Sequence, residues 1–568
     1  MIQELTPQLL MVAMLLIGVA VPIVAALLSV LLIWRYRVAV DRAMSATVGF
    51  ARHVAKPAAE GAVSDAPVPA SDADRWQAMQ RLIADGPRHM ASHYFAGAMA
   101  FALVFAVVAH WVYPHHLGVA GFLIAVWIYL WPYFLAAPLL VGARWKQQAA
   151  WFGLYLAVYA LLGTWAGSIL DVPGYRFGAV DIPPRSSVTP EGMARLWLAV
   201  NAVPSVLALA SLDRRLRAVA PLVLALVTAA VAGLLAVYFT VFSTAGVDAV
   251  VALATASGLH VAWLLLAILL VALLVFLALG WRGMAWIASA YRRRRLSDQT
   301  LLMDVLWLLF ASIYTMWLVI DGTLWLLVLP AAMLAHKLAT VFMRRAMHGA
   351  THSPVGLTFL RVFSLGRRSE TLFDAVARHW RHVGSVQLIT GPDLARHVVQ
   401  PQQFLDFLSG RLRRHFVSDP ESLQRSLAER DRGVDPDGRY RVNSFYCHAD
   451  SWQAVLPRLV RGGDIVLMDL RSFSPGNAGC TFELEFLVVH VPFARCLLLS
   501  DATTDERLVD EIVERSVRSC APNSPNVGRS PGELARFRSP TERVDVLALL
   551  RRLCENARAS AADSSAVT

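Results

Sequence analysis

The chain has 568 residues, of which 57% are hydrophobic and only 16% are charged. A typical soluble protein is about half apolar and about a quarter charged, so this composition excludes a soluble globular protein and predicts an integral membrane protein. The net charge is +11, and all but three of the basic side chains are arginines. Many of these arginines flank apolar segments, and no basic stripe alternates with aromatic residues, so we expect no nucleic-acid partner.

Nearly uncharged segments long enough to cross about 30 Å of hydrocarbon recur through the first 350 residues. They are 9–34, 95–113, 117–141, 149–170, 196–212, 218–242, 258–281, 300–320 and 323–343. The first segment has no positively charged region before it and no small-residue cleavage site after it, so we interpret it as an anchor and not as a removed signal peptide. We therefore predict a membrane domain of about nine transmembrane helices over residues 1–350, with the lipid bilayer as its partner.

Basic residues predict the orientation of these segments, because Lys and Arg favour cytoplasmic loops. The loops 35–94, 142–148, 213–217 and 282–299 hold 18 Lys or Arg, whereas the alternate loops hold three. We expect an inner (plasma) membrane protein with its N-terminus outside and everything after residue 343 in the cytoplasm. All five cysteines lie in this C-terminal part, where a reducing compartment makes disulfides unexpected.

The first cytoplasmic loop, 35–94, combines a linker with a helical pattern. Residues 56–70 are rich in Ala, Pro and Gly, as in flexible linkers. After them Trp76, Met79, Leu82 and Ile83 recur at helical spacing, which predicts a short helix over 71–84. Such a helix can lie on lipid headgroups or pack against the soluble domain, and the pattern suits both.

Two charged residues lie inside predicted spans. Asp304 is about one turn inside the eighth span, and Lys337 is about six residues inside the ninth. At about 1.5 Å per residue their depths differ little, so we predict an ion pair between adjacent antiparallel helices rather than an ion pathway. We find no internal repeat of the kind that marks many transporters.

Residues 352–516 alternate between strand and helix patterns. The expected strands are 357–363, 385–390, 440–447, 465–470 and 494–499. Helical patterns at 369–382, 401–416 and 451–460, and a helix that begins near Cys480, separate them. This order predicts a cytoplasmic α/β domain with a doubly wound parallel sheet. Residues 517–568 are expected to add a peripheral helix at 540–556, opened by a capping box of Ser539 and Glu542, and a disordered tail.

Three segments of this domain resemble the TIR family in order and spacing. Residues 362–370 read VFSLGRRSE, a strand follows at 385–390, and 465–484 read IVLMDLRSFSPGNAGCTFEL. TIR domains carry a Ser-x-Trp-Cys-x-x-Glu-Leu segment, and Cys480, Glu483 and Leu484 match it, whereas Asn477 and Gly479 replace its Ser and Trp. The resemblance is confined to the C-terminal domain. It implies that Glu483 serves cleavage of the nicotinamide N-glycosidic bond of NAD, as in the enzymes of the family; other members are non-catalytic assembly modules.

The chemistry of Glu483 can also be argued from the residues. Breaking an N-glycosidic bond develops an oxocarbenium-like ribosyl centre, which a single carboxylate can stabilise or attack. Glu483 and Glu485 are two residues apart on a helix, so they face nearly opposite ways and cannot form a close pair, whereas Cys480 shares a face with Glu483. A purely structural alternative is that Glu483 complements the amino-terminal dipole of its helix.

Further candidate residues lie at the ends of other strands. Arg367 and Arg368, in the loop that begins at Ser364, can contact phosphates, although a solvated turn explains them equally well. Cys447 and His448 end a strand, but no second group of metal ligands exists, so we expect no metal. The candidate substrate-binding residues are Ser364, Arg367, Arg368, Ser472, Cys480 and His448.

These observations predict a membrane-anchored signalling or defence protein whose TIR-like domain hydrolyses NAD or a related nucleotide, with NAD as substrate and no cofactor. One alternative is a non-catalytic TIR-like assembly module that is controlled by a membrane sensor domain. A transporter with a regulatory tail is a third, which the missing repeat disfavours. In the first two cases we expect the cytoplasmic domains of two or more copies of the chain to associate.

The orientation can be tested with reporters. A reporter fused after Tyr113 should behave as external, and one fused after Arg295 or at the C-terminus as cytoplasmic, because the basic loops are retained inside. Paired alkaline phosphatase and fluorescent protein fusions in a bacterial host measure both outcomes. The reverse pattern at these positions contradicts the predicted orientation.

Overall fold

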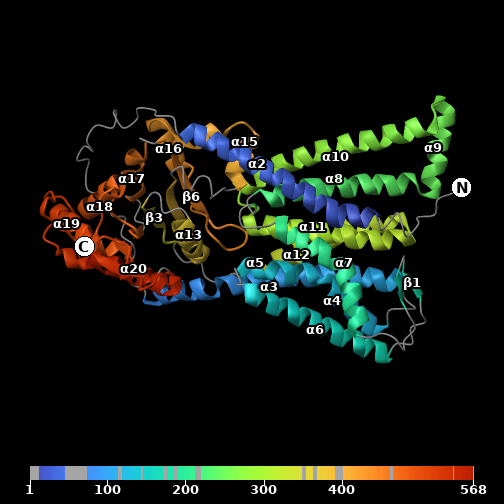
Figure 1. Cartoon of the computed structure of the whole chain (residues 1–568), viewed down its shortest axis with the longest axis horizontal. Coiled ribbons are helices and arrows are strands. Elements are labelled where there is room, and N and C mark those ends of the chain that lie inside the picture. The colour runs from blue at the N-terminus through green and yellow to red at the C-terminus, as the bar shows by residue number, and fades with distance from the viewer. Residues whose placement is uncertain are drawn as a thin grey trace. The chain divides into compact units, whose positions relative to one another are not determined.

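The computed structural model describes residues 12–44, 73–112, 118–141, 145–169, 175–177, 180–182, 190–211, 216, 219–347, 354–362, 367–390, 401–448, 451–460, 465–541 and 543–566. Two compact units make up the chain: unit 1 is Met1–Ile33 with Arg88–Gly349, and unit 2 is Trp34–Pro87 with Ala350–Thr568. Helices α2 (Val21–Met44) and α3 (Ala73–Val112) each contain a boundary between the units (Figure 1).

The described helices and strands of unit 1 are all helical except for a small antiparallel hairpin, β1 (Tyr175–Phe177) with β2 (Val180–Ile182). A π-helical turn, Leu16–Ala20, precedes α2. The remaining helices are α4 (Val119–Tyr129), α5 (Trp131–Val141), α6 (Trp145–Ile169), α7 (Pro190–Ser211), α8 (Ala220–Val241), α9 (Thr244–Ser257), α10 (Val261–Arg292), α11 (Asp298–Leu318), the 3-10 turns Val319–Asp321 and Thr323–Leu327, and α12 (Val328–Met347).

Seven helices among the described residues are long and apolar enough to cross a membrane. They are Val12–Met44, Met79–Val112, Gly121–Val141, Ala220–Val241, Val261–Arg292, Asp298–Leu318 and Thr323–Ala346. Helices α6 and α7 lie over the two other predicted segments, so the total of nine and the orientation stay predictions. In the apolar stretch of α11, 83% of the residues are buried, against 6% in α10, so α11 is central to its unit and α10 presents apolar side chains outward.

The ion pair predicted inside unit 1 is confirmed. The Lys337 ammonium on α12 bonds to Oδ2 of Asp304 on α11. Both side chains are at least partly enclosed, and the two helices pack against each other. Each charge therefore has the partner that a charged side chain needs within apolar surroundings.

Unit 2 contains a sheet of seven strands, in which all pairings are parallel, as predicted for a doubly wound domain. The strands are β3 (Leu357–Arg361), β4 (Val386–Thr390), β5 (Phe416–Val417), β6 (Val442–Cys447), β7 (Ile465–Asp469), β8 (Cys496–Ser500) and β9 (Ala535–Arg538). Their order across the sheet is β5-β6-β4-β3-β7-β8-β9. After β3 the chain moves one way to β4 and β6, and then returns to β7 on the other side of β3.

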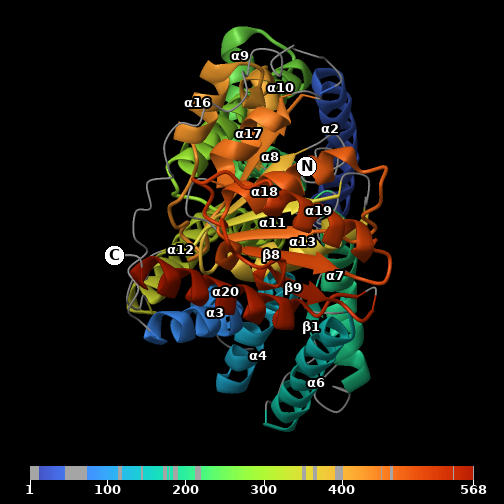
Figure 2. The same ribbon diagram turned by 90° about the vertical axis from the view of Figure 1, so that its left-hand side faces the viewer.

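Helices cover both faces of this sheet. They are α13 (Arg367–Trp380), α15 (Pro401–Leu408), α16 (Pro420–Ala428), α17 (Trp452–Val460), α18 (Ala478–His490), α19 (Glu506–Arg518) and α20 (Val546–Ala566), with 3-10 turns at Leu412–His415, Phe493–Arg495 and Pro531–Glu533. Along β7, Val466 and Met468 pack with α17, α18 and α19, whereas Ile465 and Leu467 pack with α13 and α20. This alternation is the two-residue period of a strand that is buried on both faces. Figure 2 shows α18 and α19 on one side of β8 and β9, and α20 on the other.

The amino-terminal part of α3 belongs to the core of unit 2. Met79 and Ile83 are buried together with Leu357 of β3 and Trp380 of α13. Of the two alternatives for the predicted helix at 71–84, packing against the soluble domain is therefore the correct one. The end of α2 is also buried in this unit, where the Tyr36 hydroxyl hydrogen-bonds that of Tyr446 on β6.

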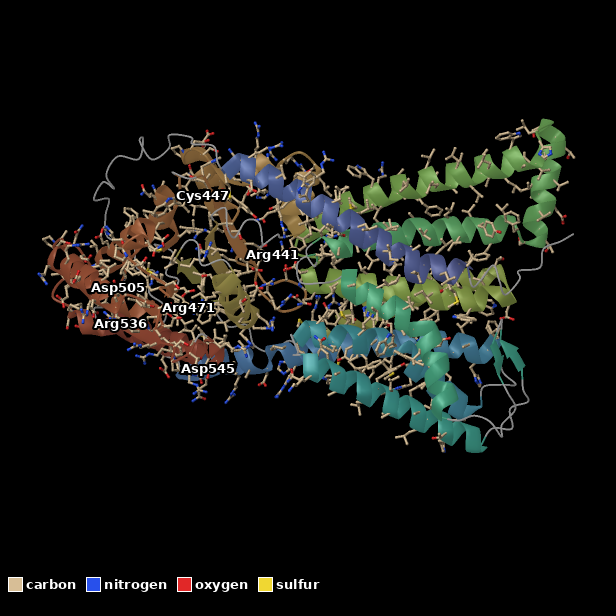
Figure 3. All side chains as sticks on the ribbon, in the orientation of Figure 1. Arg441, Cys447, Arg471, Asp505, Arg536 and Asp545 are labelled. Atoms are coloured by element: carbon tan, nitrogen blue, oxygen red, sulfur yellow. The ribbon has the colours of Figure 1, made fainter. Side chains whose placement is uncertain are left out.

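Two boundaries in unit 2 differ from the prediction for local reasons. The helix expected over 401–416 stops at Leu408, because Gly410 adopts a left-handed backbone (φ 73°) that terminates it. The helix expected from 540 starts at Val546, because Ser539 extends the sheet through a hydrogen bond to the Ser500 carbonyl. Asp545, which is labelled in Figure 3, caps this helix instead and accepts hydrogen bonds from two backbone amides.

The C-terminal segment is part of unit 2 and not a peripheral addition. Strand β9 and helix α19 lie outside the expected pattern, and β9 pairs with β8. Helix α20 buries Leu549, Leu550 and Leu553 against the same face of the sheet as α13. The helix also extends to Ala566, through most of the segment expected to be disordered.

The Asp304–Lys337 pair predicts a coupled effect on stability. Changing either residue alone to Ala leaves a lone charge in apolar surroundings, which costs about 3 kcal/mol on insertion scales. The double change should cost less than the sum of the two single changes, and thermal unfolding of the full chain in detergent measures all four proteins. Additive losses would show that the contact is energetically irrelevant.

Candidate functional site

The order of the strands places the candidate site between β3 and β7. In open parallel sheets, ligands bind outside the carboxyl ends of the strands where the order reverses, and here the reversal lies between β3 and β7. Arg361 ends β3 and pairs in register with Asp469, which ends β7. Strand β8 ends beside them at Ser500, which Asp501 follows. Charged residues therefore come to the carboxyl ends of three adjacent strands.

Asp469 is completely buried and fully neutralised. Arg471, 3% exposed, donates from Nε to Oδ1 and from Nη2 to Oδ2 of Asp469, both at 2.7 Å. The Ser369 hydroxyl, in the first turn of α13, donates to Oδ2 at 3.3 Å. Burial tends to lower the pKa of Arg471, but its hydrogen bonds to Asp469 and the charges of Asp469 and Asp501 raise this pKa overall. The bidentate pair is local to the end of β7, whereas the hydrogen bond from Ser369 and the one from Arg471 Nη2 to the Arg368 carbonyl join this end to the start of α13.

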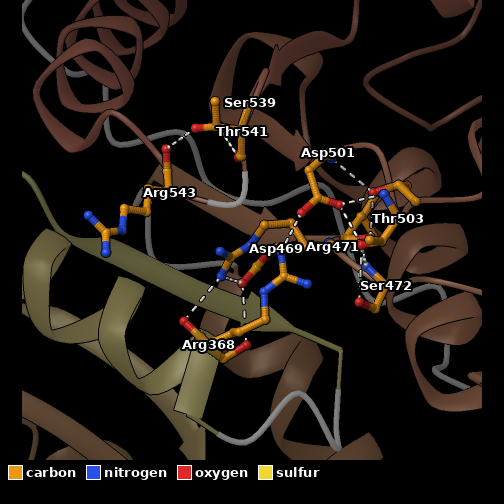
Figure 4. Close-up of polar contacts among 12 residues, drawn as sticks. Arg368, Asp469, Arg471, Ser472, Asp501, Thr503, Ser539, Thr541 and Arg543 are labelled. Atoms are coloured by element: carbon orange, nitrogen blue, oxygen red, sulfur yellow. Dashed lines mark hydrogen bonds and ion pairs between the residues drawn. The ribbon is translucent and has the colours of Figure 1, made fainter.

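A second network connects α13 with the end of β8 (Figure 4). Arg368 donates to Asp501 Oδ2 at 2.8 Å, and Thr503 donates to Asp501 Oδ1 from its backbone and its hydroxyl. Burial would raise the pKa of Asp501, but the hydrogen bonds from Thr503 and the charge of Arg368 lower it overall. The backbone amide of Ser472 donates to the Thr503 hydroxyl oxygen at 3.0 Å.

Ser472 adopts an unusual backbone conformation. Its φ is 61°, in the left-handed region that few residues other than glycine occupy. The contacts with Thr503 hold it in this state. Strained residues of this kind cluster at functional sites, where the surrounding structure over-determines them. The loop after β7 is therefore a plausible part of a ligand site, as the sequence suggested for Ser472.

Glu483 lies in this region but, unlike Asp469, forms no ion-pair contact with any residue that the structure describes. Its side chain on α18 is 1% exposed, and Oε2 has no hydrogen-bond partner among the described residues. Burial raises the pKa of Glu483 to about 8, although the charge of Arg361 lowers it in part. The carboxyl group is thus mostly protonated at neutral pH. A buried, unpartnered acid with a strongly shifted pKa is a functional-site candidate.

The neighbours of Glu483 on α18 lie as predicted. Cys480 is buried on the same face, and its thiol donates to the Arg361 carbonyl with an Sγ to O distance of 3.4 Å. Glu485 faces away from the sheet and binds Arg515 of α19 at 2.6 Å. The two glutamates therefore cannot act as a close catalytic pair.

The other predicted site residues divide into three groups. Arg368 and Ser472 belong to the networks at the switch point. His448 is buried after β6, two strands away from β3, where its ring contacts Phe416. Ser364 and the side chain of Arg367 lie outside the described residues. Within the described ranges, no group of three His, Cys, Asp or Glu side chains could hold a metal ion.

Sequence reasoning missed Arg361, Asp469, Arg471 and Asp501. Their signal is that each is a charged residue at or directly after the end of a buried apolar strand. In a parallel sheet these ends converge on one edge, so the pattern could have been used. Thr503 had no such signal, because its contact depends on the turn after β8.

The shifted pKa of Glu483 predicts how stability depends on pH. The pKa rises from 4.5 to about 8 on folding, so the folded state binds more protons and loses stability as pH increases between these values, by roughly 3 kcal/mol at pH 7. Glu483→Gln should remove this loss, so its advantage over wild type should grow from pH 5 to pH 8. Chemical denaturation of the full chain in detergent measures this difference. Glu485→Gln is the matched control, and an unchanged slope for Glu483→Gln contradicts the prediction.

Comparisons with known proteins do not assign this chain to a family. No protein-family model matches it, and no curated protein or solved structure matches it significantly. Its function must therefore be argued from the parallel sheet, the switch point and the unpartnered acid.

Proposed function

We propose that this chain is a membrane-anchored signalling protein whose C-terminal domain is TIR-like and cleaves the N-glycosidic bond of NAD or a related nucleotide. The observation that carries the proposal is Glu483, a buried carboxyl group whose Oε2 has no partner among the described residues and which lies at the switch point of a parallel sheet. Glu483 lies beyond the first turn of α18, which contains no acidic residue, so it does not complement the amino-terminal dipole of its helix. A buried polar atom in a purely structural role normally has a hydrogen-bond partner. The environment of Glu483 therefore favours a chemical role over a purely structural one.

The strand order supports a TIR-like domain. Strands β4-β3-β7-β8-β9 follow the order 2-1-3-4-5 of flavodoxin-like sheets, and β6 and β5 extend the sheet beyond β4. In such sheets the nucleotide ligand lies at the switch point between the first and third strands, which correspond here to β3 and β7. Glu483 and Arg368 both belong to this region.

Arg368 is suited to bind the phosphates of the substrate. Its side chain is 32% exposed, whereas Arg471 is 3% exposed and occupied by Asp469. It also lies in the first turn of α13, where the helix dipole and free backbone amides favour an anion. A phosphate can therefore compete with Asp501 for Arg368, while Thr503 still donates two hydrogen bonds to Asp501.

The reaction requires Glu483 to ionise. The pyridinium of NAD carries a positive charge, and its approach stabilises the carboxylate and lowers the pKa of Glu483 from about 8. As the bond between ribose C1′ and the pyridinium nitrogen breaks, its electron pair leaves with neutral nicotinamide. The Glu483 carboxylate stabilises the ribosyl cation, water attacks C1′, and the water proton is released.

Substrate access requires the site to open. Glu483, Asp469 and Arg471 are all at most 3% exposed, so the conformation described here is a closed one. This closure also favours the second candidate function, a non-catalytic assembly module in which Glu483 is only a buried neutral acid. The two functions differ in whether Glu483 ionises and stabilises a cation formed from the substrate.

Nicotinamide release from NAD distinguishes these functions. The full chain in lipid nanodiscs should release nicotinamide, and Glu483→Gln should reduce the rate by at least about 100-fold, because it removes the charge that the ribosyl cation needs. For wild type, kcat/KM should rise with pH and level off above about pH 8, the pKa of Glu483 in the free protein.

Glu485→Gln provides the matched control, since Glu485 lies on the opposite face of the same helix and contacts only the surface residue Arg515 among its described ion pairs. It should retain nearly full activity. If wild type leaves NAD intact, or if Glu483→Gln turns over normally, the catalytic proposal is wrong and the assembly module takes its place.

A further inference from the structure

Pro87 leaves a specific backbone carbonyl of α3 without its helical partner. In an α-helix the amide of residue 87 would donate to the carbonyl of residue 83, but proline has no N–H. The Ile83 carbonyl accepts instead from Nδ1 of His379, on α13, at 3.3 Å. A carbonyl can only accept, so Nδ1 of His379 must carry the proton. His379 thus replaces the hydrogen bond that Pro87 removes.

The neighbouring residues show that α3 and α13 meet closely at this point. A Cβ atom at Gly86 would lie 2.6 Å from Cγ and Nδ1 of His382, directly after α13, so only glycine allows this approach. Burial lowers the pKa of both His379 and His382, the latter to about 3, so both rings are neutral near pH 7. The contact is therefore one between neutral groups packed beside Pro87.

The opposite end of α13 holds the candidate site. Ser369 in its first turn binds Asp469, and Arg368 binds Asp501. Between these ends the helix is rigid, with Leu372, Phe373 and Val376 buried against the sheet. With 14 residues, α13 spans about 21 Å. One helix therefore connects the segment of α3 around Pro87 with the hydrogen bonds at the switch point.

We propose that α13 is a lever that couples bending of α3 at Pro87 to opening of the site at the carboxyl ends of β3 and β7. Beyond Pro87, α3 continues to Val112 and includes an apolar stretch long enough to cross a membrane. A change in the bend shifts His379, moves α13 along its axis, and strains the contacts of Arg368 and Ser369. The inference rests on the proposed location of the functional site, because it describes the regulation of that site.

Thiol labelling measures opening without any need for turnover. Cys480 is buried one turn before Glu483, and Cys496 is equally buried at the amino end of β8, the edge of the sheet away from the site. The full chain in lipid nanodiscs is labelled with a maleimide under native conditions, and mass spectrometry gives the rate at each cysteine. The ratio of the Cys480 rate to the Cys496 rate reports local opening.

Two single variants and their combination test the lever. His379→Leu removes the donor, and Pro87→Ala supplies the missing amide, so that Ile83 bonds within α3 and releases His379. Each should raise the labelling ratio by about three- to tenfold, the factor expected for loss of one hydrogen bond. The double variant should match Pro87→Ala alone, because His379 then has no acceptor left to lose.

Pro457→Ala is the matched control, since Pro457 also lies inside a helix of unit 2 but on the opposite face of the sheet. It should leave the ratio unchanged. An unchanged ratio in both Pro87→Ala and His379→Leu, an equal increase at Cys480 and Cys496, or additive effects in the double variant would each overturn the lever. A protein that fails to cleave NAD can still give the expected ratios, so failure of the proposed function is distinguished from failure of this inference.

Discussion

The reversal of strand order between β3 and β7 is the constraint on which unit 2 depends. Because strands join through right-handed crossovers, a change in the direction of progress across the sheet moves the connecting helix to the other face. Helix α13 accordingly packs on one face, whereas α17, α18 and α19 pack on the other. At the reversal no helix can cross the carboxyl ends of both strands, so polar loops and helix starts meet there. The ion pairs of the candidate site are a consequence of this topology.

Two buried carboxyl groups, those of Asp469 and Glu483, lie near the carboxyl ends of β3 and β7, and they differ in their neighbours. Asp469 has close partners, because Arg471 contacts both of its oxygens and Ser369 adds a further hydrogen bond. Glu483 is equally buried but has only the more distant charge of Arg361, so burial dominates and its pKa rises to about 8. Asp469 therefore serves to hold elements together. A cationic substrate can supply the close partner that Glu483 lacks, which is why Glu483 and not Asp469 is the proposed catalytic carboxylate.

Sequence patterns predicted the elements whose signal is local. Strands β3, β4, β7 and β8 are fully buried and largely apolar, and the helix over Met79 and Ile83 has clear amphipathic spacing. Helix α19 also carries such a pattern, with Val509, Ile512 and Val513 on its buried face, and it could have been recognised. Strand β9 could not, because ARFR has no apolar run and is defined only by its pairing with β8.

Contacts between residues distant in sequence could not be predicted, for a different reason. The spacing of Cys480, Glu483 and Glu485 identified the buried face of α18, but nothing in the sequence placed Arg361 beside Glu483. The same holds for His379, whose partner is the Ile83 carbonyl, 296 positions away. These contacts depend on which strands are neighbours and on how α3 packs, and both are settled only by the complete fold.

Helices α2 and α3 each contribute residues to both units, so unit 2 is not one continuous segment of the chain. The residues 352–558 would contain the whole sheet, yet they would lack Met79 and Ile83 from the core and Tyr36 from its hydrogen bond to Tyr446. Such a fragment exposes the apolar side chains that α3 covers, including Leu357 and Trp380. It also leaves His379 without the Ile83 carbonyl. Because the residues that contact the far end of α13 come from α3, the activity of unit 2 is best understood as a property of the intact chain.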